Sequence, residues 1–88
     1  MTPNDLIDLA DARRAALDGS ARAIRLSAGL SETEVGGAAG VAGPTISRWE
    51  RGLRQPRGLA AVRWIRLLRR LERSKVGQED GEPSARLA

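Results

Sequence analysis

Glycines recur at intervals of about eleven residues and divide much of the chain into short segments. Gly19, Gly29, Gly40 and Gly52 each follow a stretch in which apolar residues recur at helical spacing. Glycine readily adopts the left-handed conformation that ends a helix, so each of these residues is expected to stop one. This punctuation predicts an all-α fold built from short helices.

Five helices are expected from these stops and from the residues that precede each apolar stretch. Thr2, Ser20 and Ser31 can cap the first three, because their hydroxyl groups accept hydrogen bonds from free N–H groups of a first helical turn. Ser31 and Glu34 have the spacing of a capping box. Gly43 is expected to be a weak cap for the fourth helix. The expected helices are residues 3–18, 21–28, 32–39, 44–51 and 58–73.

The chain of 88 residues has room for one domain and its tails. We divide it into an accessory helix (1–19), a helical domain (20–73) and a C-terminal tail (74–88). The tail is rich in Gly, Pro, Ser and acids and is predicted to be disordered. A chain this short buries only roughly 60% of its unfolded surface. The accessory helix is therefore expected to pack on the fifth helix and enlarge the core.

Two apolar stripes identify candidate core positions. In the accessory helix, Leu6, Leu9, Ala10, Arg13 and Leu17 recur at helical spacing. In the fifth helix, the residues expected to face the core are Ala61, Trp64, Ile65, Leu68 and Leu71, and those on another face are Arg63, Arg66, Arg70 and Arg73.

Composition argues against an enzyme. The chain has no cysteine and no histidine, which excludes disulfides, thiolate metal sites and the commonest general base. The one close pair of acids in the predicted domain, Glu32 and Glu34, suits helix capping. No nucleophile–base pair or phosphate-binding loop is found, so we expect no catalysis, no cofactor, no metal and no small-molecule ligand.

Hydropathy and the N-terminal residues give an expectation for location. No apolar run approaches the ~20 residues that span a bilayer. Asp5 and Asp8 occupy a region that would be basic in an export signal. We therefore expect a cytoplasmic protein with no membrane partner.

Positive charge is concentrated in one third of the chain. The formal net charge is +4, but residues 43–75 carry ten basic groups against Glu50 and Glu72, a balance of +8. The segments on either side each have a balance of −2. Such a concentration suggests a polyanionic partner, and the alternative is a solvated basic face that binds nothing.

The third and fourth predicted helices are each about two turns long and are joined by a glycine-bearing turn, which is the helix-turn-helix arrangement. Gly36 and Gly37 make the third helix poor by propensity. Small residues there are explained if another helix packs very close.

From Arg25 onward, the sequence resembles the lambda-repressor and Cro-like helix-turn-helix family, also called the XRE family. The resemblance covers about fifty residues and combines several elements at the family's spacing. They are Arg25, Gly29-Leu30-Ser31, Gly36, Gly40-Val41, the run Thr45 to Gly52, and then Arg54, Pro56 and Arg57. The resemblance implies a five-helix lambda-repressor-like domain of the kind found in small phage or mobile-element regulators.

The resemblance also implies roles for individual residues. The helix 44–51 would enter the major groove of duplex DNA. The residues implied to contact bases are Pro44, Thr45, Ser47 and Arg48, and those implied to contact phosphates are Ser31, Arg51, Arg54 and Arg57. Val41, Ile46 and Trp49 would point inward. Arg25 and Glu50 occupy positions that form a partly buried ion pair in some members, and the alternative is two exposed, unpaired charges.

Two positions depart from the family pattern. Glu32 stands where members often have a glutamine that bonds a phosphate, and a carboxylate there is repelled by DNA. Gly43 stands at the first recognition position, which is often Gln or Arg. Direct readout of bases is therefore expected to use fewer side chains, with DNA shape contributing more.

Two functions are compatible with this pattern. The first is a repressor or Cro-like transcriptional regulator that binds double-stranded DNA. The second is an antitoxin with the same fold, whose tail from Val76 to Ala88 would order on a protein toxin while the domain regulates its own operon. Family members commonly bind two half-sites as dimers. Both a homodimer and a monomer on one half-site remain open.

Overall fold

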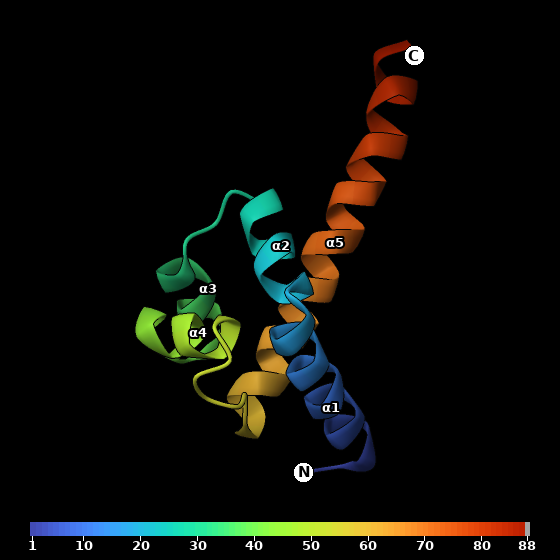
Figure 1. Cartoon of the computed structure of the whole chain (residues 1–88). Coiled ribbons are helices and arrows are strands. Elements are labelled where there is room, and N and C mark those ends of the chain that lie inside the picture. Colours follow the sequence, from blue (N-terminus) through green and yellow to red (C-terminus); the bar gives the residue numbers. More distant parts are fainter. Residues whose placement is uncertain (88) are drawn as a thin grey trace.

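A computed structural model describes the backbone of residues 1–87 and the side chains of residues 1–74. The described residues form five helices and no strand, which confirms the predicted all-α fold. In order they are α1 (Pro3–Asp18), α2 (Ser20–Ser27), α3 (Glu32–Ala39), α4 (Gly43–Glu50) and α5 (Gly58–Leu87). Figure 1 shows α3 and α4 side by side on one flank, with α1 and α5 crossing on the other.

Local signals set the first turns of α1 and α3. The Thr2 hydroxyl accepts the N–H of Asp5, whose carboxylate accepts the N–H of Thr2 in return. Ser31 and Glu34 form the same reciprocal pair at the start of α3, as their spacing predicts. Each pair satisfies two N–H groups that a helix start leaves free. The bounds expected for both helices are confirmed.

The starts of α2 and α4 differ from the sequence-based expectation. Ser20 is not a cap but the first residue of α2. Gly19 alone joins α1 to α2, and it does so in the left-handed conformation at φ +82°. Gly19 is the N-cap, and the Asp18 carboxylate before it accepts the Ser20 N–H at 2.8 Å. Helix α4 begins at Gly43, not Pro44, and Ala42 rather than Gly43 is its N-cap.

Helix α5 begins at Gly58 as expected and extends beyond residue 73, where the sequence analysis ended it. The side chains from residue 75 onward are outside the described part of the chain. Of the tail predicted to be disordered, residues 74–88, only Ser74 has a described side chain, and the disorder stays a prediction. Among the described residues, no helix combines the length and the apolarity needed to cross a bilayer.

One hydrophobic core holds all five helices together. Its large, fully buried members include Trp64, Ile46, Leu68 and Val35. The Trp49 ring packs on Trp64 with 5.0 Å between ring centroids. The other buried apolar residues are Leu9, Ala12, Ala15, Ala16, Ala21, Ala39, Ala61, Val62 and Ile65, with Leu71 packed against them.

The apolar stripe expected for α1 is only partly buried. Leu6 and Leu17 are 55% and 80% exposed, and Ala10 is exposed as well. The buried face is instead formed by Leu9 and three alanines that follow it. Small side chains on this face let α1 approach the other helices closely, whereas larger ones would hold it away.

Helix α1 packs along α5, as expected, and ion pairs line the contact. Arg66 donates to Asp5 at 2.8 Å and to Asp8 at 2.9 Å. Arg69 donates to Asp8 at 2.6 Å and also to Asp11. The hydrogen bonds from Arg69 and Arg66 hold the pKa of Asp8 below its ordinary value. We call these five residues the α1–α5 ion-pair network.

Candidate nucleic-acid interface

The turn between α3 and α4 is short and tightly closed. Gly40 ends α3 at φ +84°, and the Val41 N–H donates to the Gly36 carbonyl at 2.9 Å. A β-carbon on Gly36 would lie 2.6 Å from the Val41 carbonyl oxygen, which is backbone and cannot easily move away. Gly36 is therefore required by the close crossing, whereas a β-carbon on Gly37 would meet nothing within 4 Å.

Gly43 is buried against α3 at the start of α4. A β-carbon there would lie 2.6 Å from the Thr33 hydroxyl oxygen and 3.2 Å from two of its backbone atoms. The residue that departs from the family pattern is thus a point of contact between the two helices. Its lack of a side chain brings the first turn of α4 directly onto the first turn of α3.

Helix α4 has an inner face that fixes it and an outer face that is free. Ile46 is fully buried and Trp49 is 4% exposed, whereas Val41 in the preceding turn is only partly buried. The four residues expected to contact bases lie toward the other side. Pro44 and Arg48 are exposed, and Thr45 and Ser47 are half-buried. The inner contacts fix how α4 sits on the domain, so the side from which the outer side chains project is fixed as well.

The end of α4 directs the following loop. Gly52 adopts φ +73°, and the Leu53 N–H reaches back to the Arg48 carbonyl at 2.9 Å. Together with the bond from the Gly52 N–H to the Trp49 carbonyl at 3.2 Å, this bond forms the Schellman pattern that terminates a helix at glycine. Because the chain reverses here, the loop stays beside α4. It carries Arg54 and Arg57, both exposed.

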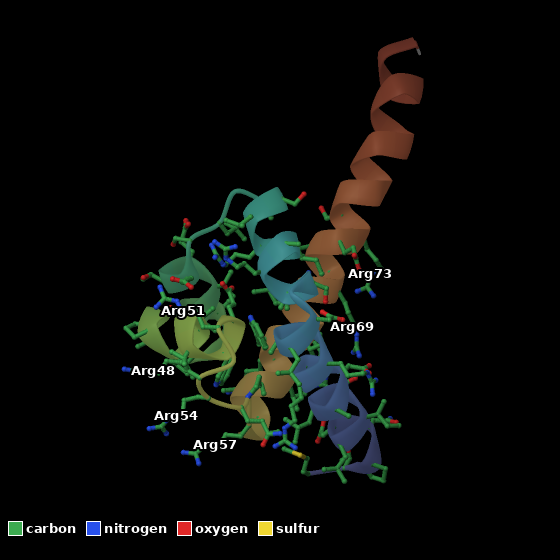
Figure 2. All side chains as sticks on the ribbon, in the orientation of Figure 1. Arg48, Arg51, Arg54, Arg57, Arg69 and Arg73 are labelled. Atoms are coloured by element: carbon green, nitrogen blue, oxygen red, sulfur yellow. The ribbon has the colours of Figure 1, made fainter. Side chains whose placement is uncertain are left out.

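Four arginines project from α4 and this loop on one side of the molecule (Figure 2). None of them has an ion pair or hydrogen-bond partner for its guanidinium among the described residues. The same view shows Arg69 and Arg73 on the opposite side, along α5. The four unpartnered arginines of α4 and its loop are called the free arginine face; they are Arg48, Arg51, Arg54 and Arg57.

Ser31, the remaining residue expected to contact a phosphate, is exposed at the start of α3. Its hydroxyl oxygen accepts the Glu34 N–H at 3.0 Å, and its own N–H donates to the Glu34 carboxylate at 2.9 Å. These hydrogen bonds lower the pKa of Glu34. Ser31 therefore has only its O–H left to offer an anion, beside the negative charges of Glu34 and Glu32.

Arg25 and Glu50 are brought together beneath the interface. Arg25 donates through Nε and Nη2 to the two carboxylate oxygens of Glu50, at 2.7 and 2.9 Å. The side chains are 9% and 1% exposed. Arg25 also donates to the Leu30 carbonyl at 2.9 Å and lies 3.9 Å from the Glu32 carboxylate. The Glu50 hydrogen bonds raise the pKa of Arg25 further above its ordinary value.

This pair links the end of α4 to α2 and to the entry of α3. A planar guanidinium that meets a carboxylate with two bonds fixes orientation as well as distance. Glu32, the second departure from the family pattern, lies near the Arg25 guanidinium, which offsets part of its negative charge.

Sequence reasoning assigned no role at the interface to Arg13 on α1. Its Nε donates to the Pro56 carbonyl at 2.9 Å, so α1 is tied to the loop that carries Arg54 and Arg57. A signal existed, because Arg13 is the one charged residue in the stripe that recurs at helical spacing in α1. An arginine within an apolar stripe has to find a polar partner, and here it finds a carbonyl 43 residues away.

Comparison with known proteins agrees with this geometry. A family model described as helix-turn-helix matches residues 22–74, which include α3, α4 and the loop that follows. No match was found among curated proteins or solved structures. Helix α1 lies outside the matched segment.

Proposed function

Because the chain belongs to the lambda-repressor/Cro-like helix-turn-helix family, whose domains bind double-stranded DNA, we propose that it is a sequence-specific transcriptional regulator. The observation that carries this proposal is the free arginine face. Four guanidinium groups project from α4 and the loop that follows it, and the side chains of residues 1–74 give them no hydrogen-bond or ion-pair partner. In this proposal α4 lies in the major groove, the protein binds DNA in the cytoplasm, and it catalyses no reaction.

The outer side of α4 supplies the residues proposed to read sequence. Arg48 is exposed, and its fork of donors fits the N7 and O6 acceptors of guanine. Thr45 lies one turn earlier and offers a methyl group to thymine or a hydroxyl to a base edge. Pro44 and Ser47 flank these two and contact neighbouring base edges.

Arg51, Arg54 and Arg57 are proposed to bind phosphates. They follow the reading residues in sequence and project from the same side of the molecule (Figure 2). Phosphate contacts of this kind set the register and the angle of the recognition helix, and they carry no sequence information of their own. Ser31 adds a hydroxyl donor at the start of α3.

We propose further that two copies bind together on an operator with two half-sites. Dimeric helix-turn-helix proteins place their half-sites about 34 Å apart, which is one turn of DNA. A second copy doubles the contacts that a single short recognition helix can make. This arrangement predicts two chains for each operator duplex.

Selection of bound sequences from random duplex DNA tests the proposal. We expect enrichment of one motif with approximate two-fold symmetry, and two chains for each selected duplex. If six to ten phosphates are contacted, the affinity should fall by roughly 10³–10⁵ between 50 and 200 mM salt. A selected duplex that binds no more tightly than random DNA would refute the proposed function.

The variant Arg48→Ala tests the assignment of the reading residue. It should lose about 1–3 kcal/mol of discrimination at one base pair of the selected motif. Arg73→Ala, on the opposite side of the molecule, removes the same charge and should keep the discrimination. Equal discrimination by wild type and Arg48→Ala would remove Arg48 from the reading set and leave the fold unaffected.

A further inference from the structure

A hollow of about 580 Å³ lies beside the outer side of α4. Its lining comes from α1, the turn before α4, α4 itself, the loop that follows it, and the first turn of α5. Four of the lining residues are arginines and none is acidic. Arg48, Arg54 and Arg57 belong to the free arginine face, whereas Arg13 comes from α1, outside the segment that matches the family.

Arg13 is held in this hollow by one of its five N–H donors. The Nε group donates to the carbonyl of Pro56, which is itself buried. The guanidinium is planar, so fixing Nε restricts the directions in which the two terminal nitrogens point. Neither terminal nitrogen has a hydrogen-bond partner among the described residues. Arg13 therefore carries a partly oriented fork with four unused donors.

The positive charges around the hollow repel one another. Four cations line one concave surface, and no carboxylate on that lining offsets them. Arg14, the next residue along α1, differs because it forms an ion pair with Asp11. An anion in the hollow would be attracted by this positive lining, and it would lower the repulsion among the cations.

We propose that this hollow binds a backbone phosphate of duplex DNA, and that Arg13 makes α1 part of the DNA interface. The inference rests on the proposed function and extends it to a residue outside the matched family segment. Thr45 and Arg48 also line the hollow, so the phosphate lies next to the bases that α4 reads. Arginine forks fit two phosphate oxygens at once, which matches the donors that Arg13 has free.

The hydrogen bond to Pro56 gives Arg13 a second effect. It ties the position of the fork to the loop, so Arg13, Arg54 and Arg57 approach the DNA as one unit. The accessory helix then contributes to binding directly, and not only through the burial that it adds to the core.

The test compares Arg13→Gln with Arg73→Gln on the selected operator over a range of salt concentrations. Both variants remove one positive charge, but Arg73 lies on the opposite side of the molecule (Figure 2). Each phosphate contact contributes about 0.9 to the slope of log affinity against log salt. We expect Arg13→Gln to reduce the magnitude of the slope by about 0.9 and Arg73→Gln to leave it unchanged. Arg13→Lys keeps the charge and should restore the wild-type slope.

Three outcomes would overturn the inference while wild type still binds its operator selectively. The first is equal slopes for Arg13→Gln and Arg73→Gln. The second is an Arg13→Lys variant with the same reduced slope as Arg13→Gln. Arg13 would then act on binding only through its hydrogen bond to Pro56, and not as a phosphate contact. The third is tight binding of inorganic pyrophosphate that depends on Arg13, with an unchanged DNA slope, which would assign the hollow to a small polyphosphate. Failure of wild type to select any DNA would instead refute the proposed function itself.

Discussion

The arginines of the α1–α5 ion-pair network and those of the free arginine face have opposite electrostatic surroundings. Arg66 and Arg69 donate to three aspartates on α1, and each of these arginines contacts two carboxylates. The four arginines of α4 and its loop contact no carboxylate among the described residues. The chain thus uses the same side chain to hold helices together on one flank, and leaves it unsatisfied on the other.

The difference separates two explanations of the basic composition. If positive charge served solubility alone, paired and unpaired arginines would be scattered over the surface. Instead four unpaired arginines lie together over the helix-turn-helix, and three of the four aspartates of the first 18 residues contact arginines of α5. The other arginines with no ion pair or side-chain hydrogen bond among the described residues lie on α2 and α5; they are Arg22, Arg63, Arg70 and Arg73. The net charge of +4 is therefore distributed so that a strong positive field remains where the polyanion is proposed to bind.

The buried pair of Arg25 and Glu50 should give the largest effect, because it is the extreme case of a paired arginine. Arg25→Met leaves Glu50 buried without a cation and should cost roughly 3–5 kcal/mol of unfolding free energy. Glu50→Leu should cost less, since Arg25 keeps the Leu30 carbonyl and the nearby Glu32. The double variant should be more stable than either single one. Urea unfolding measures all three.

A double variant whose cost equals the sum of the two single costs would contradict this account. Additive costs would mean that each side chain contributes through packing alone and that no charge is stranded. Arg25→Lys is a useful control, because it keeps the charge and loses the two-bond geometry with the carboxylate. Its cost should fall between those of wild type and Arg25→Met.

A pair of charge-matched variants tests the comparison directly. Arg54→Gln should leave the unfolding free energy within about 0.5 kcal/mol of wild type, as for surface changes away from other contacts. It should weaken DNA binding and reduce the salt slope by about 0.9. Arg66→Gln should do the reverse, lowering stability through the loss of its bonds to Asp5 and Asp8 while the salt slope is retained.

The comparison fails if both variants weaken DNA binding to the same extent. Net charge alone would then govern affinity, and the division between paired and unpaired arginines would have no functional meaning. Urea unfolding and DNA binding should be measured on the same preparations, so that loss of folded protein is not mistaken for loss of contacts.

Local features of the fold were readable from the sequence, and long-range pairings were not. The bounds of α1 and α3, the capping box of Ser31 and the left-handed turn at Gly40 depend on residues within one helical turn of each other. The contacts of Arg66 with Asp5 and Asp8 join residues 61 and 58 positions apart. Nothing in the sequence sets that register, because it follows from how α1 crosses α5.

The candidate site shows the same division. The positions of the reading and phosphate-binding residues came from the family resemblance, and their contacts with DNA stay predictions. The burial of Gly43 against Thr33 and the bond from Arg13 to Pro56 needed the tertiary structure. The exposure of Leu6 and Leu17 was missed for a related reason, since helical spacing fits two adjacent faces of α1 and packing chooses between them.

The smallest expected effect concerns Asp8, which bridges both arginines of the α1–α5 ion-pair network. Those bonds, first from Arg69 and then from Arg66, lower the pKa of Asp8 from its ordinary 3.8. Its contribution to stability is therefore present above pH 3.8 and is lost as the pH falls through the lower pKa of the folded state. Asp8→Asn should be less stable than wild type at pH 7, by a difference that salt reduces.

The pH dependence of that difference distinguishes charge pairing from shape. When the wild-type aspartate is protonated it resembles asparagine, so the two unfolding free energies should converge as the pH falls below 3.8. A difference that is constant from pH 7 to pH 3 would mean that Asp8 acts through hydrogen bonds that it makes in both of its protonation states and that asparagine cannot form. In that case the pairing on this flank would not be electrostatic, and the contrast with the free arginine face would rest on the buried pair of Arg25 and Glu50 alone.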